Sequence, residues 1–231
     1  MANDKRTPTK PNAAPFGDIA AFLATAKALA PAGEGRGRLI FALDATMSRQ
    51  PTWDSALHLQ AQMFEEAGKI GALDVQLVYF RGFGECRASR WVSDARALRD
   101  LMTGIECRGG NTQIAKVLGH ARKETAKRKV NVLVFVGDAL EEPIDDLAAI
   151  AGELGLLGVR LFLFQEGRDE AVERGFRELA RLSGGAYARF DPNAPQEFAS
   201  LLRAAAAYAT GGRRALEKRG DAERLLLSQL K

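Results

Sequence analysis

Short apolar runs alternate with helical patterns along most of this chain, and two of these runs constrain the fold most strongly. Residues 39–43 and 132–136 are apolar at every position. A strand of this kind is covered on both faces, which is typical of a parallel sheet between two helix layers. Further strand-like runs lie at 73–80, 159–164 and 185–190, and segments with helical spacing lie at 52–69, 112–127, 143–154, 169–183 and 195–209. We therefore predict a three-layer α/β/α domain with a mostly parallel central sheet.

The segment 80–92, FRGFGECRASRWV, departs from this alternation. Its glycines come directly after a strand, which favours a hairpin. The returning strand is then antiparallel, and we expect it to end near Trp91 at one edge of the sheet. A short helix over 94–102 is expected to follow.

Composition divides the chain into four parts. Residues 1–17 contain several prolines, and we expect a disordered lead-in there. Residues 18–37 carry a helical pattern and a glycine-rich linker, and residues 38–209 form the α/β domain. Residues 210–231 are expected to be a basic C-terminal tail. With 46% hydrophobic and 27% charged residues, the chain can bury an ordinary globular core.

Several classes of protein are disfavoured by the same composition. No stretch approaches the roughly 18 apolar residues that span a bilayer, and the first residues lack a secretory signal. Cys86 and Cys107 give neither a disulfide framework nor a metal cluster, which favours a cytoplasmic location. The net charge of +4 is modest, and the basic run 120–129 lacks interleaved aromatic residues. We expect neither a membrane nor a nucleic-acid partner, and the oligomeric state is left open.

Three loops at the carboxyl edge of the predicted sheet carry oxygen-bearing side chains. Ligands of open α/β sheets bind at this edge. Together the loops supply two carboxylates and three hydroxyls, which are Asp44, Thr46, Ser48, Thr112 and Asp138. Hard oxygen ligands suit Mg²⁺, Ca²⁺ or Mn²⁺ rather than zinc. We predict a divalent-cation site formed by these five residues, with Mg²⁺ preferred.

A cation held in this way keeps water in its remaining positions, so an Asp or Glu of another protein could displace one water. Trp53, Asn111 and Glu141 are candidates for the rim of such a partner-binding surface. Core packing is the favoured interpretation for Trp53, and an acid at a helix start is the favoured one for Glu141 and its neighbour Glu142. Taken singly, the hydroxyls are also typical turn or cap residues, so the metal prediction depends on the whole set.

Catalysis is disfavoured by the residue types at these loops. A phosphatase of the haloacid-dehalogenase type needs a second carboxylate two residues after the first, where this chain has Thr46. The sequence contains neither a GxSxG elbow nor a Walker loop. His58 and His120 lie in predicted helices away from the three loops. We therefore expect a protein that is not an enzyme. A Mg²⁺-dependent hydrolase or phosphatase is the least favoured of the functions considered.

The pattern resembles the von Willebrand factor A domain and its metal-ion-dependent adhesion site (MIDAS). That family has Asp-x-Ser-x-Ser after its first strand, a Thr in a second loop and an Asp in a third. Thr46 replaces the first Ser here, and Gly137 and Ala139 replace the common flanks of the third-loop Asp. The segment FRELARLSGGAYARF is similar to that family's penultimate helix, Gly-Gly turn and last strand, so the resemblance covers about residues 38–209.

The resemblance implies a Rossmann-like fold and a divalent-cation-dependent protein-interaction module. It also implies an adaptor in an intracellular assembly, of the kind that works beside AAA+ ATPases or chaperones. The Ala, Arg and Gly content is typical of a bacterial protein. The main alternative is a structural scaffold whose metal site is vestigial and whose tail or basic helix makes the contacts.

Overall fold

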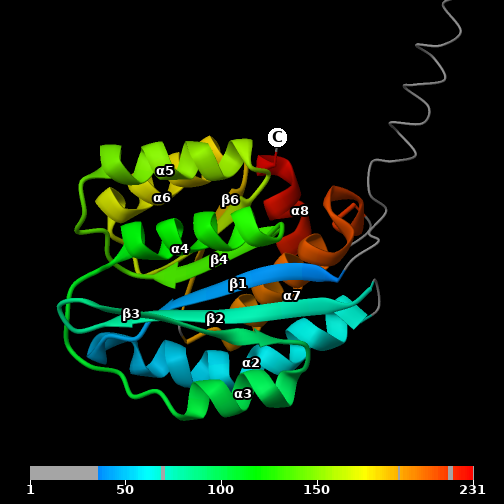
Figure 1. Ribbon diagram of the computed structural model, residues 1–231, viewed down its shortest axis with the longest axis horizontal. Coiled ribbons are helices and arrows are strands. Elements are labelled where there is room, and N and C mark those ends of the chain that lie inside the picture. Colours follow the sequence, from blue (N-terminus) through cyan, green and yellow to red (C-terminus); the bar gives the residue numbers. More distant parts are fainter. Residues whose placement is uncertain (1–35, 69–70, 192, 218–220, 231) are drawn as a thin grey trace, which may run out of the picture. The chain divides into compact units, whose positions relative to one another are not determined.

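The computed structural model describes residues 36–68, 71–191, 193–217 and 221–230 of the 231-residue chain. Its centre is a six-stranded sheet with the order β3-β2-β1-β4-β5-β6 (Figure 1). The strands are β1 (Gly37–Asp44), β2 (Leu73–Arg81), β3 (Glu85–Val92), β4 (Val132–Gly137), β5 (Arg160–Glu166) and β6 (Ala186–Phe190). All neighbours are parallel except β2 and β3, which form an antiparallel hairpin. The predicted fold class is therefore confirmed, including the single antiparallel edge strand.

Helices cover both faces of the sheet (Figure 1). The helices are α2 (Gln50–Gly68), α3 (Ala95–Thr103), α4 (Ile114–Lys127), α5 (Ile144–Leu156), α6 (Glu170–Ser183), α7 (Pro195–Gly211) and α8 (Asp221–Gln229). One hydrophobic core joins the sheet to α2, α3, α7 and α8, and a second joins it to α4, α5 and α6. The central strands face both cores, which is why residues 39–43 of β1 and 132–136 of β4 are apolar at every position.

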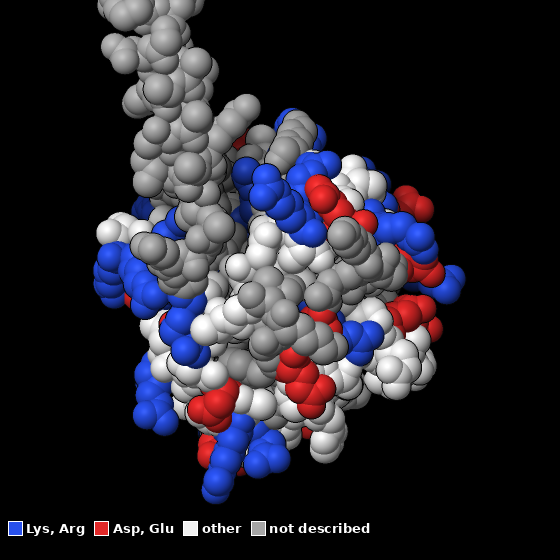
Figure 2. Space-filling view, turned by 90° about the vertical axis from the view of Figure 1, so that its right-hand side faces the viewer, with Lys and Arg blue, Asp and Glu red and all other residues white. Residues whose placement is uncertain are grey.

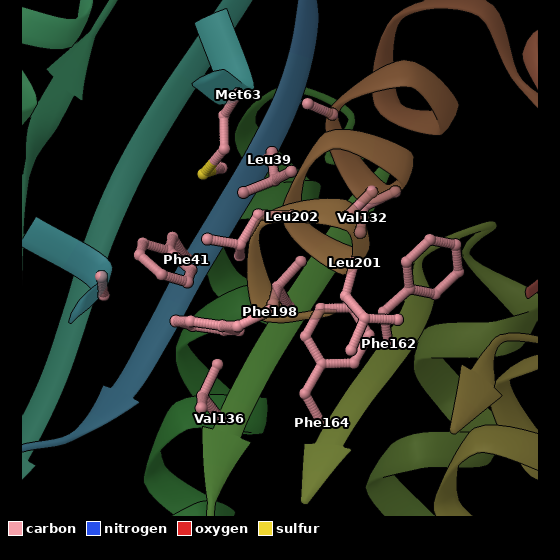
Figure 3. Close-up of a cluster of buried hydrophobic side chains, with 14 of the residues drawn as sticks. Leu39, Phe41, Met63, Val132, Val136, Phe162, Phe164, Phe198, Leu201 and Leu202 are labelled. Carbon is pink, nitrogen blue, oxygen red and sulfur yellow. The ribbon is translucent and has the colours of Figure 1, made fainter. Parts of the chain in front are cut away.

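The first core is built largely by α7 (Figure 3). Phe198, Leu201 and Leu202 of this helix point toward the sheet, where they meet residues such as Phe41 and Phe162. All five side chains are 4% exposed or less. After them the helix lies close to the start of β1: a Cβ at Gly37 would be 2.4 Å from the Ala209 carbonyl oxygen, so only glycine fits there.

Sequence signals explain where several helices begin and end. The Asp94 side chain accepts a hydrogen bond from the Ala97 amide and caps α3. Asp169 does the same for α6 through the amides of Ala171 and Val172. That helix ends at Gly184, whose φ of 65° is in the left-handed region that glycine tolerates.

The C-terminal segment differs from its prediction as a separate basic tail over 210–231. Within its described part, α8 packs against β6 and α7, and Leu226 and Leu230 are 0% and 6% exposed. The Gln229 amide covers the edge strand: its oxygen accepts a hydrogen bond from the Tyr187 amide, and its nitrogen donates to the Tyr187 carbonyl. The segment belongs to the domain because its leucines complete the first core. The predicted lead-in (1–17) and almost all of the predicted helix and linker (18–37) lie outside the described residues.

Two neighbouring leucines of α8 give a matched stability test. Leu226→Ala is expected to lower the free energy of unfolding by about 2–4 kcal/mol, because it removes a fully buried side chain. Leu225→Ala removes a side chain that is 47% exposed and should change it by less than about 0.5 kcal/mol. Urea denaturation of both variants measures the difference. Equal effects would contradict the helix register described above.

Candidate functional site

Asp44 is the last residue of β1, and its carboxylate is almost fully buried, at 4% exposure. One carboxylate oxygen accepts a hydrogen bond from the Thr46 amide at 2.8 Å. Burial raises the pKa of Asp44 from 3.8 to about 6, because removal from water disfavours the charged form. Hydrogen bonds from Thr46 and the charge of Arg49 act in the opposite direction, and Asp138 adds to the rise. A buried carboxylate in this state would be stabilised by a nearby cation.

The loop that carries Thr112 is positioned by backbone contacts with its neighbours. The Arg108 amide donates to the Ala45 carbonyl at 2.9 Å, and the Asn111 amide donates to the Gly82 carbonyl at 3.3 Å. Gly110 lies so close to the β2–β3 turn that an added Cβ would be 2.1 Å from the Gly82 oxygen. The second loop is therefore fixed between the first loop and the hairpin, at the carboxyl ends of β1 and β2.

Two glutamates then connect Thr112 to the loop that follows β4. The Thr112 hydroxyl donates to Glu142 at 2.6 Å and accepts from the Glu141 amide at 3.1 Å. The Glu141 carboxylate accepts from the Thr112 amide at 2.6 Å, and Glu142 also accepts from the Ala115 amide at the start of α4. Both acids thus hold the second and third loops together. Because a hydroxyl has two acceptor lone pairs, Thr112 retains one that could face a cation.

Asp138 follows β4 and forms an ion pair that sequence reasoning missed. Its carboxylate lies 3.1 Å from a guanidinium nitrogen of Arg49, and the other terminal nitrogen lies 2.6 Å from Glu166, the last residue of β5. The Thr52 hydroxyl also donates to Glu166. The Arg49 side chain is only 12% exposed. A signal for Glu166 was present, since it is an acid at the end of an apolar strand, as Asp44 is.

These residues fit a divalent cation by their chemistry and charge. Asp44, Asp138 and Glu166 carry three negative charges against the single positive charge of Arg49, and Glu141 and Glu142 beside Thr112 add to the negative excess. The described side chains include no group of three or more histidines, cysteines and acids placed to hold a metal. A site here therefore depends on hydroxyl oxygens, from Thr46 and Thr112, beside two carboxylates. When bound, such a cation would offer an electrophilic position to an incoming carboxylate.

The remaining predicted site residues differ in where they lie and in how exposed they are. Trp53 is 2% exposed and packs edge-on against Tyr79, with ring centroids 6.3 Å apart. Its candidate role as a rim residue is wrong, and core packing, the interpretation favoured from the sequence, is confirmed, because the first turn of α2 faces the core. Asn111 and Glu141 are exposed at the site. The backbone of Ser48 lies in a 3₁₀ turn (Met47–Arg49), and its side chain lies outside the described part of the structure.

Comparison with known proteins gives structural matches only. No protein-family model and no curated protein matches the chain. Among solved structures, it is similar to a von Willebrand factor type A protein from Catenulispora acidiphila, with a TM-score of 0.60 and 15% identity. That match covers 77% of this chain and 43% of the other, so this chain spans less than half of that protein.

Two further matches have similar scores. An aerotolerance-related membrane protein from Bacteroides fragilis matches with a TM-score of 0.55 and 18% identity, over 73% of this chain and 98% of that one. Proximal thread matrix protein 1 from the mussel byssus, in a structure with a zinc-occupied MIDAS motif, matches with a TM-score of 0.56 and 14% identity. This match covers 74% of this chain and 46% of the other.

At these identities the likeness establishes the fold alone. In the described part of the chain, no helix is both long and apolar enough to cross a membrane. The strand order, the edge hairpin and the structural matches agree with one another. This chain has the fold of a von Willebrand factor A domain.

Proposed function

We propose that this chain is a divalent-cation-dependent protein-interaction module. Asp44, Thr46, Thr112 and Asp138, together with Ser48, would hold the cation, and a carboxylate of a partner would complete its coordination. The observation that carries this proposal is the excess of negative charge beside buried hydroxyls at the carboxyl edge of the sheet. It is supported by the mussel protein of the same fold, whose MIDAS motif holds zinc. Oxygen donors favour Mg²⁺ for this chain.

The surroundings of the site suit a partner with apolar side chains beside its acid. Met47, in the first loop, is 69% exposed, and Phe83, at the tip of the β2–β3 hairpin, is 90% exposed. The hairpin tip contacts the second loop through Gly82, so Phe83 belongs to the same edge of the sheet as the candidate site. Exposed aromatic and Met side chains are enriched in protein interfaces. They would take the rim role that Trp53, being buried, does not have.

We favour binding over hydrolysis for the same residues. The position that a haloacid-dehalogenase-type phosphatase gives to its acid–base carboxylate is Thr46, and a neutral hydroxyl is a poor proton donor near pH 7. Basic and acidic side chains are interspersed on the face shown in Figure 2, which gives no support to a nucleic-acid partner there. An intracellular adaptor role beside an AAA+ ATPase or a chaperone remains part of this proposal.

The test measures metal binding and partner capture together. Calorimetry with Mg²⁺ is expected to give binding for the wild type and at least about a 100-fold loss for Asp44→Ala and Asp138→Ala, since changes beyond the ligands already cost 10–100-fold. Capture of a partner from lysate on the immobilised chain should require Mg²⁺ and be lost with EDTA. Asp146→Ala, which removes an exposed acid in the first turn of α5, is the matched control. Capture that survives both EDTA and Asp44→Ala would favour the scaffold alternative instead.

A further inference from the structure

We propose that Arg49 is a resident cation that competes with the metal ion for Asp138 and thereby sets the affinity of the site for divalent cations. This inference rests on the proposed function. From the sequence alone, Asp138 is a candidate metal ligand without a known partner. In the structure, its carboxylate is already paired with Arg49.

The geometry that supports competition is the bridging position of the guanidinium. Arg49 lies 3.1 Å from Asp138 and 2.6 Å from Glu166, and its side chain is 12% exposed. A planar guanidinium with several N–H donors can pair with two carboxylates at once. Asp138 is more exposed than Glu166, with 30% against 11% of its side chain accessible. Of the two carboxylates, Asp138 is therefore the one that an incoming ion could reach.

Glu166 gives Arg49 a second partner that does not depend on Asp138. The Thr52 hydroxyl donates to Glu166 and holds it in place at the end of β5. Arg49 can therefore release Asp138 and still remain paired. A metal ion on Asp138 and Asp44 would repel the guanidinium, and in a partly buried site this repulsion is only weakly screened. The two arrangements, bridged and metal-bound, exclude each other at Asp138.

Competition predicts opposite effects for changes at the two ends of this network. Arg49→Met frees Asp138 and removes one positive charge, so Mg²⁺ affinity should rise by about tenfold or more. Glu166→Gln removes the charge that draws Arg49 away from Asp138, so Mg²⁺ affinity should fall several-fold. Glutamine can still accept the hydrogen bond from Thr52.

The experiment is calorimetric titration of the metal-stripped full chain with Mg²⁺ and, separately, Mn²⁺. Arg108→Met is the matched control, because Arg108 lies in the neighbouring loop with 61% of its side chain exposed and is paired only weakly, with Glu106 at 3.7 Å. It removes the same charge without freeing a site carboxylate, and affinity should stay within about twofold, because exposed charges are largely screened. Circular dichroism establishes that each variant is folded. If Arg49→Met does not fold, Arg49→Gln replaces it, since glutamine keeps N–H donors for one carboxylate but carries no charge, and it should also tighten binding.

The outcomes separate this inference from the function on which it rests. Tighter binding by the Arg49 variant with weaker binding by Glu166→Gln supports both. Unchanged affinity in the Arg49 variant, or an equal gain in Arg108→Met, overturns the competition and leaves the metal site standing. Absence of binding in the wild type and in every variant overturns the metal site and the competition together. Binding that appears only when Arg49 is replaced supports both in the strongest form.

Discussion

Asp44→Asn is expected to stabilise the metal-free protein at pH 7.5 and to abolish its affinity for divalent cations. The pKa of Asp44 is raised from 3.8 to about 6, chiefly by burial. A shift of about two pKa units corresponds to roughly 3 kcal/mol, which the charged carboxylate costs the native state at neutral pH. Asparagine keeps an oxygen that can accept the hydrogen bond from the Thr46 amide, and it carries no charge.

The sign of the pH dependence follows from the raised pKa. Between about pH 4 and pH 6, the native state retains the Asp44 proton while the unfolded chain releases it. The contribution of Asp44 therefore lowers wild-type stability as the pH rises through this range, and the loss is complete above about pH 6. Asp44→Asn lacks this contribution. Its advantage over the wild type should be small at pH 4 and reach up to roughly 3 kcal/mol at pH 7.5.

Urea denaturation in EDTA at the two pH values measures this difference. In a second series, Mg²⁺ should raise the melting temperature of the wild type and leave that of Asp44→Asn unchanged, because a ligand stabilises only a state that binds it. Asp146→Asn, an exposed acid of α5, should behave as the wild type in both series. A variant that is less stable than the wild type at pH 7.5 would contradict the conclusion that the charge of the buried Asp44 carboxylate costs stability.

Gly110→Ala adds a single methyl group, yet we expect it to lower both the stability of the protein and its affinity for metal ions. An added Cβ would lie 2.1 Å from the Gly82 carbonyl oxygen and 2.4 Å from the Gly82 carbonyl carbon, and both belong to the backbone. The second loop would have to move away from the hairpin, and Thr112 would move with it. We expect a loss of roughly 2–3 kcal/mol in the free energy of unfolding, as for overpacked sites. Metal affinity should fall by about 10–100-fold, as when groups that support the ligands are changed.

Gly109→Ala provides the matched control for this change. A Cβ at Gly109 would meet no other atom within 4 Å. Its stability should stay within about 0.5 kcal/mol of the wild type and its metal affinity should be unchanged. Thermal denaturation and Mg²⁺ titration of the two variants give the comparison. Similar behaviour of both would show that the contact between the second loop and the hairpin does not position Thr112.

Much of the fold could be predicted from the sequence because it depends on local patterns. Two runs without a polar residue identified β1 and β4, which occupy the centre of the sheet and are covered on both sides. The glycines after the second strand identified the hairpin and its antiparallel edge strand. The ends of these strands also placed Asp44 and Asp138 at one edge, because parallel strands end together there. Thr112 lies in the loop between α3 and α4.

Other features depend on contacts between residues far apart in the chain, and no local pattern encodes them. The helical spacing of Trp53 favoured the core without excluding the rim of the site, and packing against Tyr79 decides for the core. The helical spacing of the last leucines did not show which core they complete, because their partners lie on α7 and β6. Whether a residue is buried depends on which other elements pack against it, and only the tertiary structure determines that packing.

The candidate site shows the same division. The sequence by itself determined which oxygen-bearing side chains stand at strand ends, because residue type and strand pattern are local properties. Only the tertiary structure decided that Arg49 pairs with Asp138 and Glu166, and that Glu141 and Glu142 hold Thr112. Electrostatic pairing depends on distance in space rather than in sequence. Arg49 is 89 positions from Asp138 and 117 positions from Glu166, and only folding brings these charges together.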